Sequence, residues 1–91
     1  MSDPTARRGD NVMALLQAIV NSGRPWKKQE MLSFLFMRYR AGVREETLES
    51  IWRQLLDRGI IYGKPISKGA NIYVYSVETK RLEQLTGVHL R

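Results

Sequence analysis

The chain has 91 residues, a mass of 10.6 kDa, no cysteine and a formal net charge of +6. This length allows one domain and excludes two, and the lack of cysteine excludes a disulfide scaffold, so stability must come from an apolar core. Hydrophobic residues make up 43% of the chain, which is enough to build that core. The excess of 15 Lys and Arg over 9 Asp and Glu favours an acidic partner, most commonly nucleic acid.

Residues 1–9 predict a flexible basic arm, because Pro4 and Gly9 interrupt them and no apolar period runs through them. They lack the run of roughly 7–15 apolar residues that a secretory signal requires. No later segment approaches the about 20 apolar residues of a membrane-spanning helix. We therefore expect a cytoplasmic protein that does not associate with a membrane.

The first helix is expected from Asp10 or Asn11 to a turn at 21–23. Asp and Asn side chains cap the free N–H groups of a first helical turn. Gly23 tolerates the left-handed conformation that ends many helices. Between these ends, apolar residues recur at the spacing of one helical face: Val12, Leu15, Leu16 and Ile19.

The second helix is expected from Trp26 or Lys27 to Tyr39, after a connector around Pro25. Its apolar stripe is wider than one core-facing side requires. Two explanations are open, namely deep burial between the other helices or a second contact surface such as a dimer interface. The stripe consists of Met31, Leu32, Phe34, Leu35, Phe36, Met37 and Tyr39.

A turn at 41–43 leads to the third helix, at about 44–58, which Gly59 closes. The hydrophobic period then changes from 3.6 to 2, the period of a strand. Strands are expected at 60–62 and 72–77, joined by turn-forming residues at 67–71 into a two-stranded hairpin. Pro65 indicates an edge strand or a break in pairing. A short helix at 78–86 and a tail at 87–91 complete the chain.

This order of elements resembles the winged helix-turn-helix superfamily of DNA-binding proteins, which includes many transcriptional regulators. The resemblance rests on the turn and helix start at 41–48, followed by Ile51, Leu55 and the segment 56–61. It covers roughly residues 10–77. It implies an α+β, mainly α fold in which three helices precede a two-stranded β-hairpin wing and a short C-terminal helix. The domain would span residues 10–86.

The resemblance also implies which residues contact DNA. The third helix would enter the major groove and read base edges, through Arg44, Glu45, Thr47, Ser50, Arg53 and Gln54. The wing would contribute Lys64, Lys68 and Asn71. The start of the second helix would neutralise a phosphate through Arg24, Lys27 and Lys28. Arg7 and Arg8 would place the arm in the minor groove.

The third helix is nevertheless acidic. Residues 44–58 hold three arginines against three glutamates and one aspartate, a net charge of −1. Three explanations are open. The carboxylates stabilise the helix dipole; or they accept from cytosine N4 and repel wrong bases; or this helix does not read DNA.

Catalysis has little support in this sequence. His89 is the only histidine, no cysteine can join it, and neither of the two common glycine-rich phosphate-binding motifs occurs. We expect that the protein is not an enzyme and that it has no cofactor and no metal site.

These patterns predict a small regulator that binds double-stranded DNA. A homodimer is expected because one such module offers little specific contact area; the second helix or Leu82, Leu85 and Val88 would supply the interface. The alternative is a winged-helix protein-interaction module in a larger complex, which the acidic third helix suits. A third possibility is single-stranded nucleic acid stacked on Tyr62, Tyr73 and Tyr75.

Overall fold

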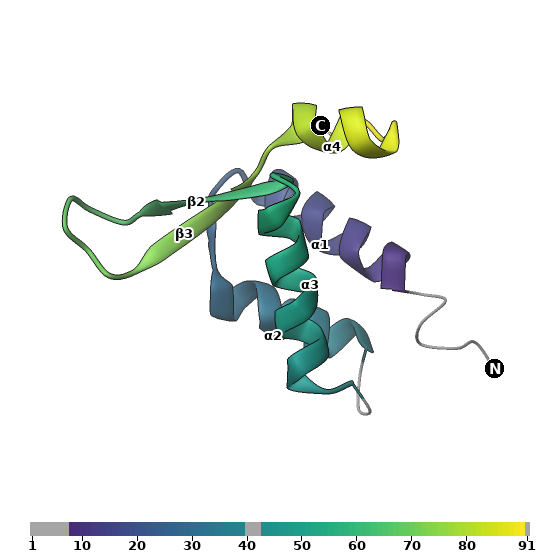
Figure 1. Ribbon diagram of the computed structural model, residues 1–91, viewed down its shortest axis with the longest axis horizontal. Coiled ribbons are helices and arrows are strands. Elements are labelled where there is room, and N and C mark those ends of the chain that lie inside the picture. The colour runs from purple at the N-terminus through teal and green to yellow at the C-terminus, as the bar shows by residue number, and fades with distance from the viewer. Residues whose placement is uncertain (1–7, 40–42, 91) are drawn as a thin grey trace.

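The computed structural model describes residues 8–39 and 43–90 (Figure 1). The fold is α+β and mainly helical, with four helices and one three-stranded antiparallel sheet in this part of the chain. In chain order the elements are α1 (Arg8–Ser22), β1 (Trp26–Lys27), α2 (Lys28–Tyr39), α3 (Glu45–Asp57), β2 (Ile61–Pro65), β3 (Tyr73–Val77) and α4 (Thr79–Thr86). None of these helices combines the length and apolarity needed to cross a membrane.

The glycines that the sequence predicted as helix ends perform that role. Gly23 and Gly59 adopt φ values of 67° and 71° after α1 and α3. After α3 the Gly59 amide donates to the Leu56 carbonyl, and the Ile60 amide donates to the Leu55 carbonyl, both at 3.0 Å. This pair of bonds satisfies the last carbonyls of the helix and turns the chain sharply. The sharp turn determines where β2 begins.

The starts of α1 and α3 each differ slightly from the prediction. α1 begins at Arg8, so Arg8 and Gly9, which the sequence assigned to the arm, are helical. Asp10 therefore lies in the first turn, where its negative charge interacts favourably with the helix dipole. α3 follows Arg44, whose extended backbone occupies the cap position without any side-chain hydrogen bond, as its residue type predicts. Residues 1–7 of the arm and 41–42 of the turn lie outside the described ranges.

The sheet has three strands, whereas the sequence predicted a hairpin of two. Its order is β1-β3-β2, because Trp26 pairs with Tyr75 and Lys27 pairs with Val74. The sequence placed these two residues at the start of the second helix. A two-residue strand is too short to show a period of two, and its partner lies far away in sequence, so no local pattern reveals it.

The β2–β3 hairpin ends in a tight turn, as the sequence predicted. The Ile66 amide donates to the Ile72 carbonyl at 2.9 Å, and the Ala70 amide donates to the Ser67 carbonyl at 2.9 Å. Gly69 has φ +81°, as the third residue of a type II turn requires. Pro65 lies on the edge strand β2 and pairs with Tyr73 of β3.

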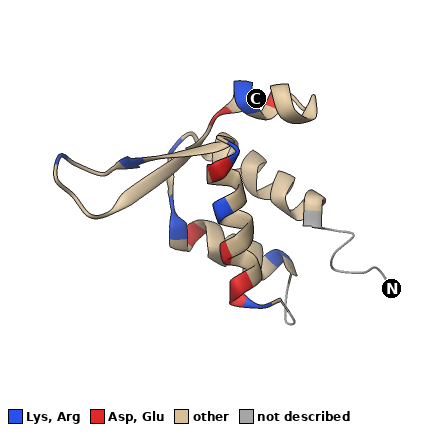
Figure 2. Ribbon diagram, in the orientation of Figure 1, with Lys and Arg blue, Asp and Glu red and all other residues tan. Residues whose placement is uncertain are grey.

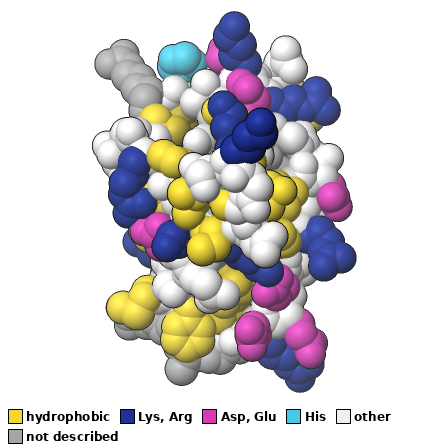
Figure 3. All heavy atoms as spheres, turned by 90° about the vertical axis from the view of Figure 1, so that its left-hand side faces the viewer, with side chains coloured by type: hydrophobic (Ala, Val, Ile, Leu, Met, Phe, Trp, Pro, Cys, Tyr) yellow, Lys and Arg dark blue, Asp and Glu magenta, His cyan; other side chains and the backbone are white. Residues whose placement is uncertain are grey.

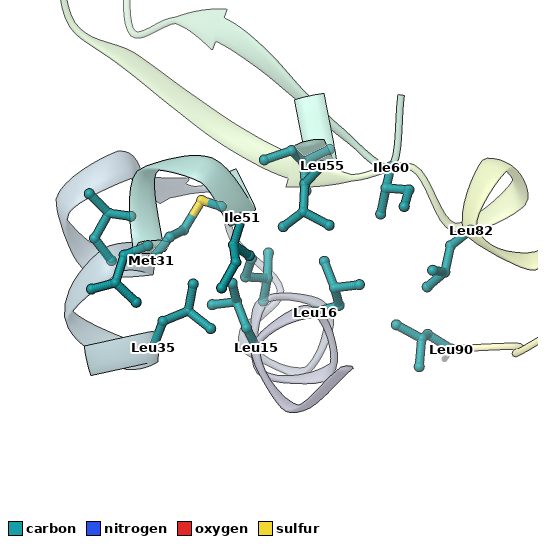
Figure 4. Close-up of a cluster of buried hydrophobic side chains, with 13 residues drawn as sticks. Leu15, Leu16, Met31, Leu35, Ile51, Leu55, Ile60, Leu82 and Leu90 are labelled. Carbon is teal, nitrogen blue, oxygen red and sulfur yellow. The ribbon is translucent and has the colours of Figure 1, made fainter. Parts of the chain in front are cut away.

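The core lies between the helices and the inner face of the sheet (Figure 4). The C-terminal segment contributes more to it than expected. Leu82, proposed for a dimer interface, is buried, and Leu90, in the expected tail, is only 8% exposed. Both point toward Leu16 and Ile60. The buried hydrophobic residues are Leu15, Leu16, Ile19, Met31, Leu32, Leu35, Leu48, Ile51, Leu55, Ile60, Ile61, Leu82 and Leu90.

One part of the wide apolar stripe of α2 is buried in the core and another part is exposed, so each of the two explanations accounts for a part of it. Met31, Leu32 and Leu35 are buried in the core. Phe36 and Met37 remain 50% and 73% exposed. Burial therefore accounts for only part of the stripe, and the exposed part forms a separate apolar surface.

Candidate nucleic-acid interface

The inner face of the sheet packs on the helices. Gly63, Tyr75 and Trp26 lie side by side across the three strands. The Tyr75 ring meets Trp52 of α3 edge-on, with ring centroids 5.7 Å apart, and Trp26 meets Phe34 of α2 at 5.9 Å. The neighbouring row of residues must face the other way, because strand side chains alternate between faces.

That outer row consists of Lys64, Val74 and Lys27. Strands lie about 4.8 Å apart, so the Cα atoms of the two lysines are about 10 Å apart with Val74 between them. Both lysines are exposed, and within residues 8–39 and 43–90 neither enters an ion pair. The Lys64 ammonium lies 5.6 Å from the centroid of the Tyr62 ring on the same face. We call Lys64, Val74 and Lys27 the lysine row.

The hairpin carries positive charge and no negative charge. Residues 59–77 contain two lysines and no Asp or Glu. Figure 2 shows basic positions along the hairpin, whereas acidic positions recur along α3. Figure 3 looks at the hairpin from its tip, where basic side chains lie above and between hydrophobic ones and acidic side chains lie around the margin, several of them at the lower right. Lys68 occupies the corner of the turn, and Asn71 is exposed nearby.

Arg24 is already paired within the protein. Its guanidinium donates to the Glu30 carboxylate at 2.7 Å, and Glu30 also accepts from the Lys27 amide at 3.1 Å. The hydrogen bond between the two side chains raises the pKa of Arg24 and lowers the pKa of Glu30. Of the positive charge near the start of α2, that of Lys27 is therefore more available than that of Arg24.

Lys28 joins α2 to α3. Its ammonium lies 2.9 Å from the Glu49 carboxylate and 4.3 Å from the centroid of the Trp52 ring. The opposite charge and the aromatic face both hold the ammonium close to the protein. Of the three expected phosphate contacts, Arg24 and Lys28 are therefore held in ion pairs within the protein. Lys27 instead belongs to the lysine row.

The exposed side of α3 brings together four of the six expected base-reading residues. Thr47 is partly buried. Gln54 donates to the Ser50 hydroxyl at 3.5 Å and lines a different groove, between α1, α3 and α4. The depression on α3 contains two arginines and three glutamates, and one of these glutamates, Glu49, is paired with Lys28. Its lining residues are Arg44, Glu45, Glu46, Glu49, Ser50 and Arg53.

Two of the expected contacts belong to the arm. Arg7 and the side chain of Arg8 lie outside the described residues. Conversely, the structure reveals exposed hydrophobic residues on the hairpin that the sequence analysis did not single out for binding, namely Ile66 and Ile72. Their symmetric positions on either side of the 67–71 turn were a signal available in the sequence.

Within the described part of the chain, no three His, Cys, Asp or Glu side chains cluster to hold a metal ion. His89 Nδ1 lies 3.2 Å from a Glu83 carboxylate oxygen on the surface. Comparisons with models of protein families, with curated proteins and with solved structures found no match.

Proposed function

We propose that this protein is a small DNA-binding regulator of winged-helix type that grips the duplex backbone through the outer face of its sheet. The lysine row is the observation that carries the proposal. Lys27 and Lys64 are exposed, lie about 10 Å apart, and face solvent on a sheet whose hairpin has no acidic residue. Long lysine stems allow both ammonium groups to reach phosphates on either side of a groove about 6–12 Å wide.

In this proposal α3 contributes selectivity more than affinity. Phosphate contacts supply most of the binding free energy, and the unpaired charges in the depression on α3 include glutamates, which repel phosphate. Arg53 is exposed beside Ser50 in that depression. An arginine reads guanine, and a glutamate such as Glu46 accepts from cytosine and rejects other bases.

A mobility-shift titration of random duplex across a salt series tests the proposal. Each lost phosphate contact lowers the slope of log K against log salt by about 0.9. Lys27→Ala combined with Lys64→Ala should therefore reduce the slope by about 2. Lys80→Ala is the matched control, because Lys80 is an exposed lysine on α4, outside the sheet.

Absence of binding at low salt would refute DNA binding, and an unchanged slope in the double variant would refute this interface. In the same assay, Arg53→Ala distinguishes the contribution of α3 to selectivity from the contribution of the lysine row to affinity. It should relax preference for a selected site while random duplex binds as before.

The exposed apolar end of α2 favours a second candidate function, a protein-interaction module that pairs with another copy or with a larger complex. Phe36 and Met37 line a surface groove of about 400 Å³ together with Leu48 and Glu45 of the α3 region. Sedimentation should show a dimer that Phe36→Ser with Met37→Ser converts to monomer. If this variant changes assembly while no duplex is shifted at low salt, the interaction module is the better assignment.

A further inference from the structure

The tip of the β2–β3 hairpin presents two isoleucines to solvent. Ile66 and Ile72 are 52% and 54% exposed. They lie directly across from each other, since the Ile66 amide donates to the Ile72 carbonyl at 2.9 Å. Each is two residues from a member of the lysine row, Lys64 or Val74, so both side chains continue its outer face. We call Ile66 and Ile72 the isoleucine pair.

The fold gives the isoleucine pair no packing role beyond the hairpin. Every residue of β2 after Ile61 is exposed, and the tip projects away from the helices along the longest dimension of the molecule, 47 Å (Figure 1). Single exposed apolar residues are common, but a facing pair of large ones at the outermost point of a protein indicates a contact surface.

The charges around the isoleucine pair indicate the chemistry of its partner. Lys64 precedes the pair and Lys68 lies in the turn between its two members, with no acidic residue from 59 to 77. A DNA groove is complementary to this arrangement, because phosphates line its rims and the base step that an apolar side chain opens exposes the apolar faces of its bases.

We propose that the isoleucine pair is a wedge that enters the minor groove of duplex DNA and opens a base step, so that the protein bends the DNA. This inference rests on the proposed DNA binding and adds DNA bending to it. Isoleucine is among the residues that insert between base pairs, and such wedges kink a duplex by about 20–90° toward the major groove. Flexible pyrimidine–purine steps open at the lowest cost, whereas A-tracts resist.

Energy transfer between dyes on the two ends of a duplex of about 20 base pairs, with a central TA step, measures the bend. Wild-type protein should bring the ends closer. Ile66→Thr with Ile72→Thr keeps β-branching, and with it the preference for a strand, but places hydroxyls in the wedge. This variant should bind and leave the duplex straight. Ile66→Val with Ile72→Val is the matched control and should still bend it.

Affinity for an A-tract duplex of equal length should be about tenfold lower for wild type, and the Thr variant should lose this discrimination. A mobility shift without bending, or equal bending by the Thr variant, overturns the wedge and leaves the proposed DNA binding intact. Absence of any mobility shift overturns both the wedge and the proposed DNA binding. Insertion of the isoleucine pair into anionic lipid vesicles, without binding to duplex, would overturn both as well.

Discussion

Gly63 lies where β2 passes beneath the ring of Tyr75, and a methyl group there has no room. A Cβ at this position would meet Tyr75 Cε1 at 2.7 Å and Cδ1 at 3.1 Å. Opposite residues of this pair do not exchange backbone hydrogen bonds, which brings their Cα atoms to about 4.5 Å. Ordinary contact begins near 3.4 Å, so the ring would have to retreat by about 0.7 Å.

The ring cannot retreat without cost, because its edge-on contact with Trp52 fixes its position. Overpacking of this kind costs about 1–3 kcal/mol, and replacing a strand glycine by alanine returns about 0.5–1 kcal/mol of backbone entropy. Gly63→Ala should therefore destabilise the protein by about 1–2 kcal/mol. For a domain of this size that lowers Tm by about 5–15 °C.

Thermal unfolding followed by circular dichroism measures this effect. Gly9→Ala is the matched control, because no atom lies within 4 Å of a Cβ at that position in α1; it should be neutral or slightly stabilising. Tyr75→Leu removes the ring, so Gly63→Ala should cost little in that background. A Gly63→Ala protein as stable as wild type, or an equal loss in both backgrounds, would refute the reasoning.

Two further predictions concern the Arg24–Glu30 ion pair and the C-terminal segment. The hydrogen bond from Arg24 lowers the pKa of Glu30 below its usual 4.5, so the pair stabilises the fold above that pH and loses this contribution as pH falls through the lower folded pKa. The urea midpoint of Glu30→Gln should lie below that of wild type at neutral pH and converge with it in acid, and a constant gap would contradict this assignment. Leu90→Ser should cost about 2 kcal/mol, since Leu90 is buried near the surface. The exposed control Val88→Ser should stay within about 0.5 kcal/mol in thermal unfolding, and equal losses would show that the C-terminal segment does not pack as described.

The sequence predicted the elements that local patterns encode. Helix ends at Gly23 and Gly59, the turn at 67–71 and the edge position of Pro65 were all expected and all occur. Each depends on one residue type with a restricted backbone or a missing donor, so the signal is local. The third strand and the burial of Leu90 depend on partners distant in the chain, which no local period contains.

The candidate site shows the same division. The resemblance to winged helices singled out Lys27 and Lys64, but their placement in one row follows from the pairing of two strands with β3. The ion pair between Lys28 and Glu49 links different helices, and that between Arg24 and Glu30 spans strand β1, so neither follows from helical spacing. Sequence composition therefore indicates an acidic partner, while tertiary contacts determine which cations remain available to it.

The open side of β2 has a consequence for crowded solutions. An exposed strand edge is a template on which another chain can add a strand and begin aggregation. The Ile66 amide points toward β3, so alternation directs the backbone nitrogen of residue 65 outward, where proline has no hydrogen to donate. Together with the charge of Lys64, Pro65 makes this edge a poor template. The hairpin can thus carry exposed hydrophobic residues on its face without inviting strand-by-strand growth along its side.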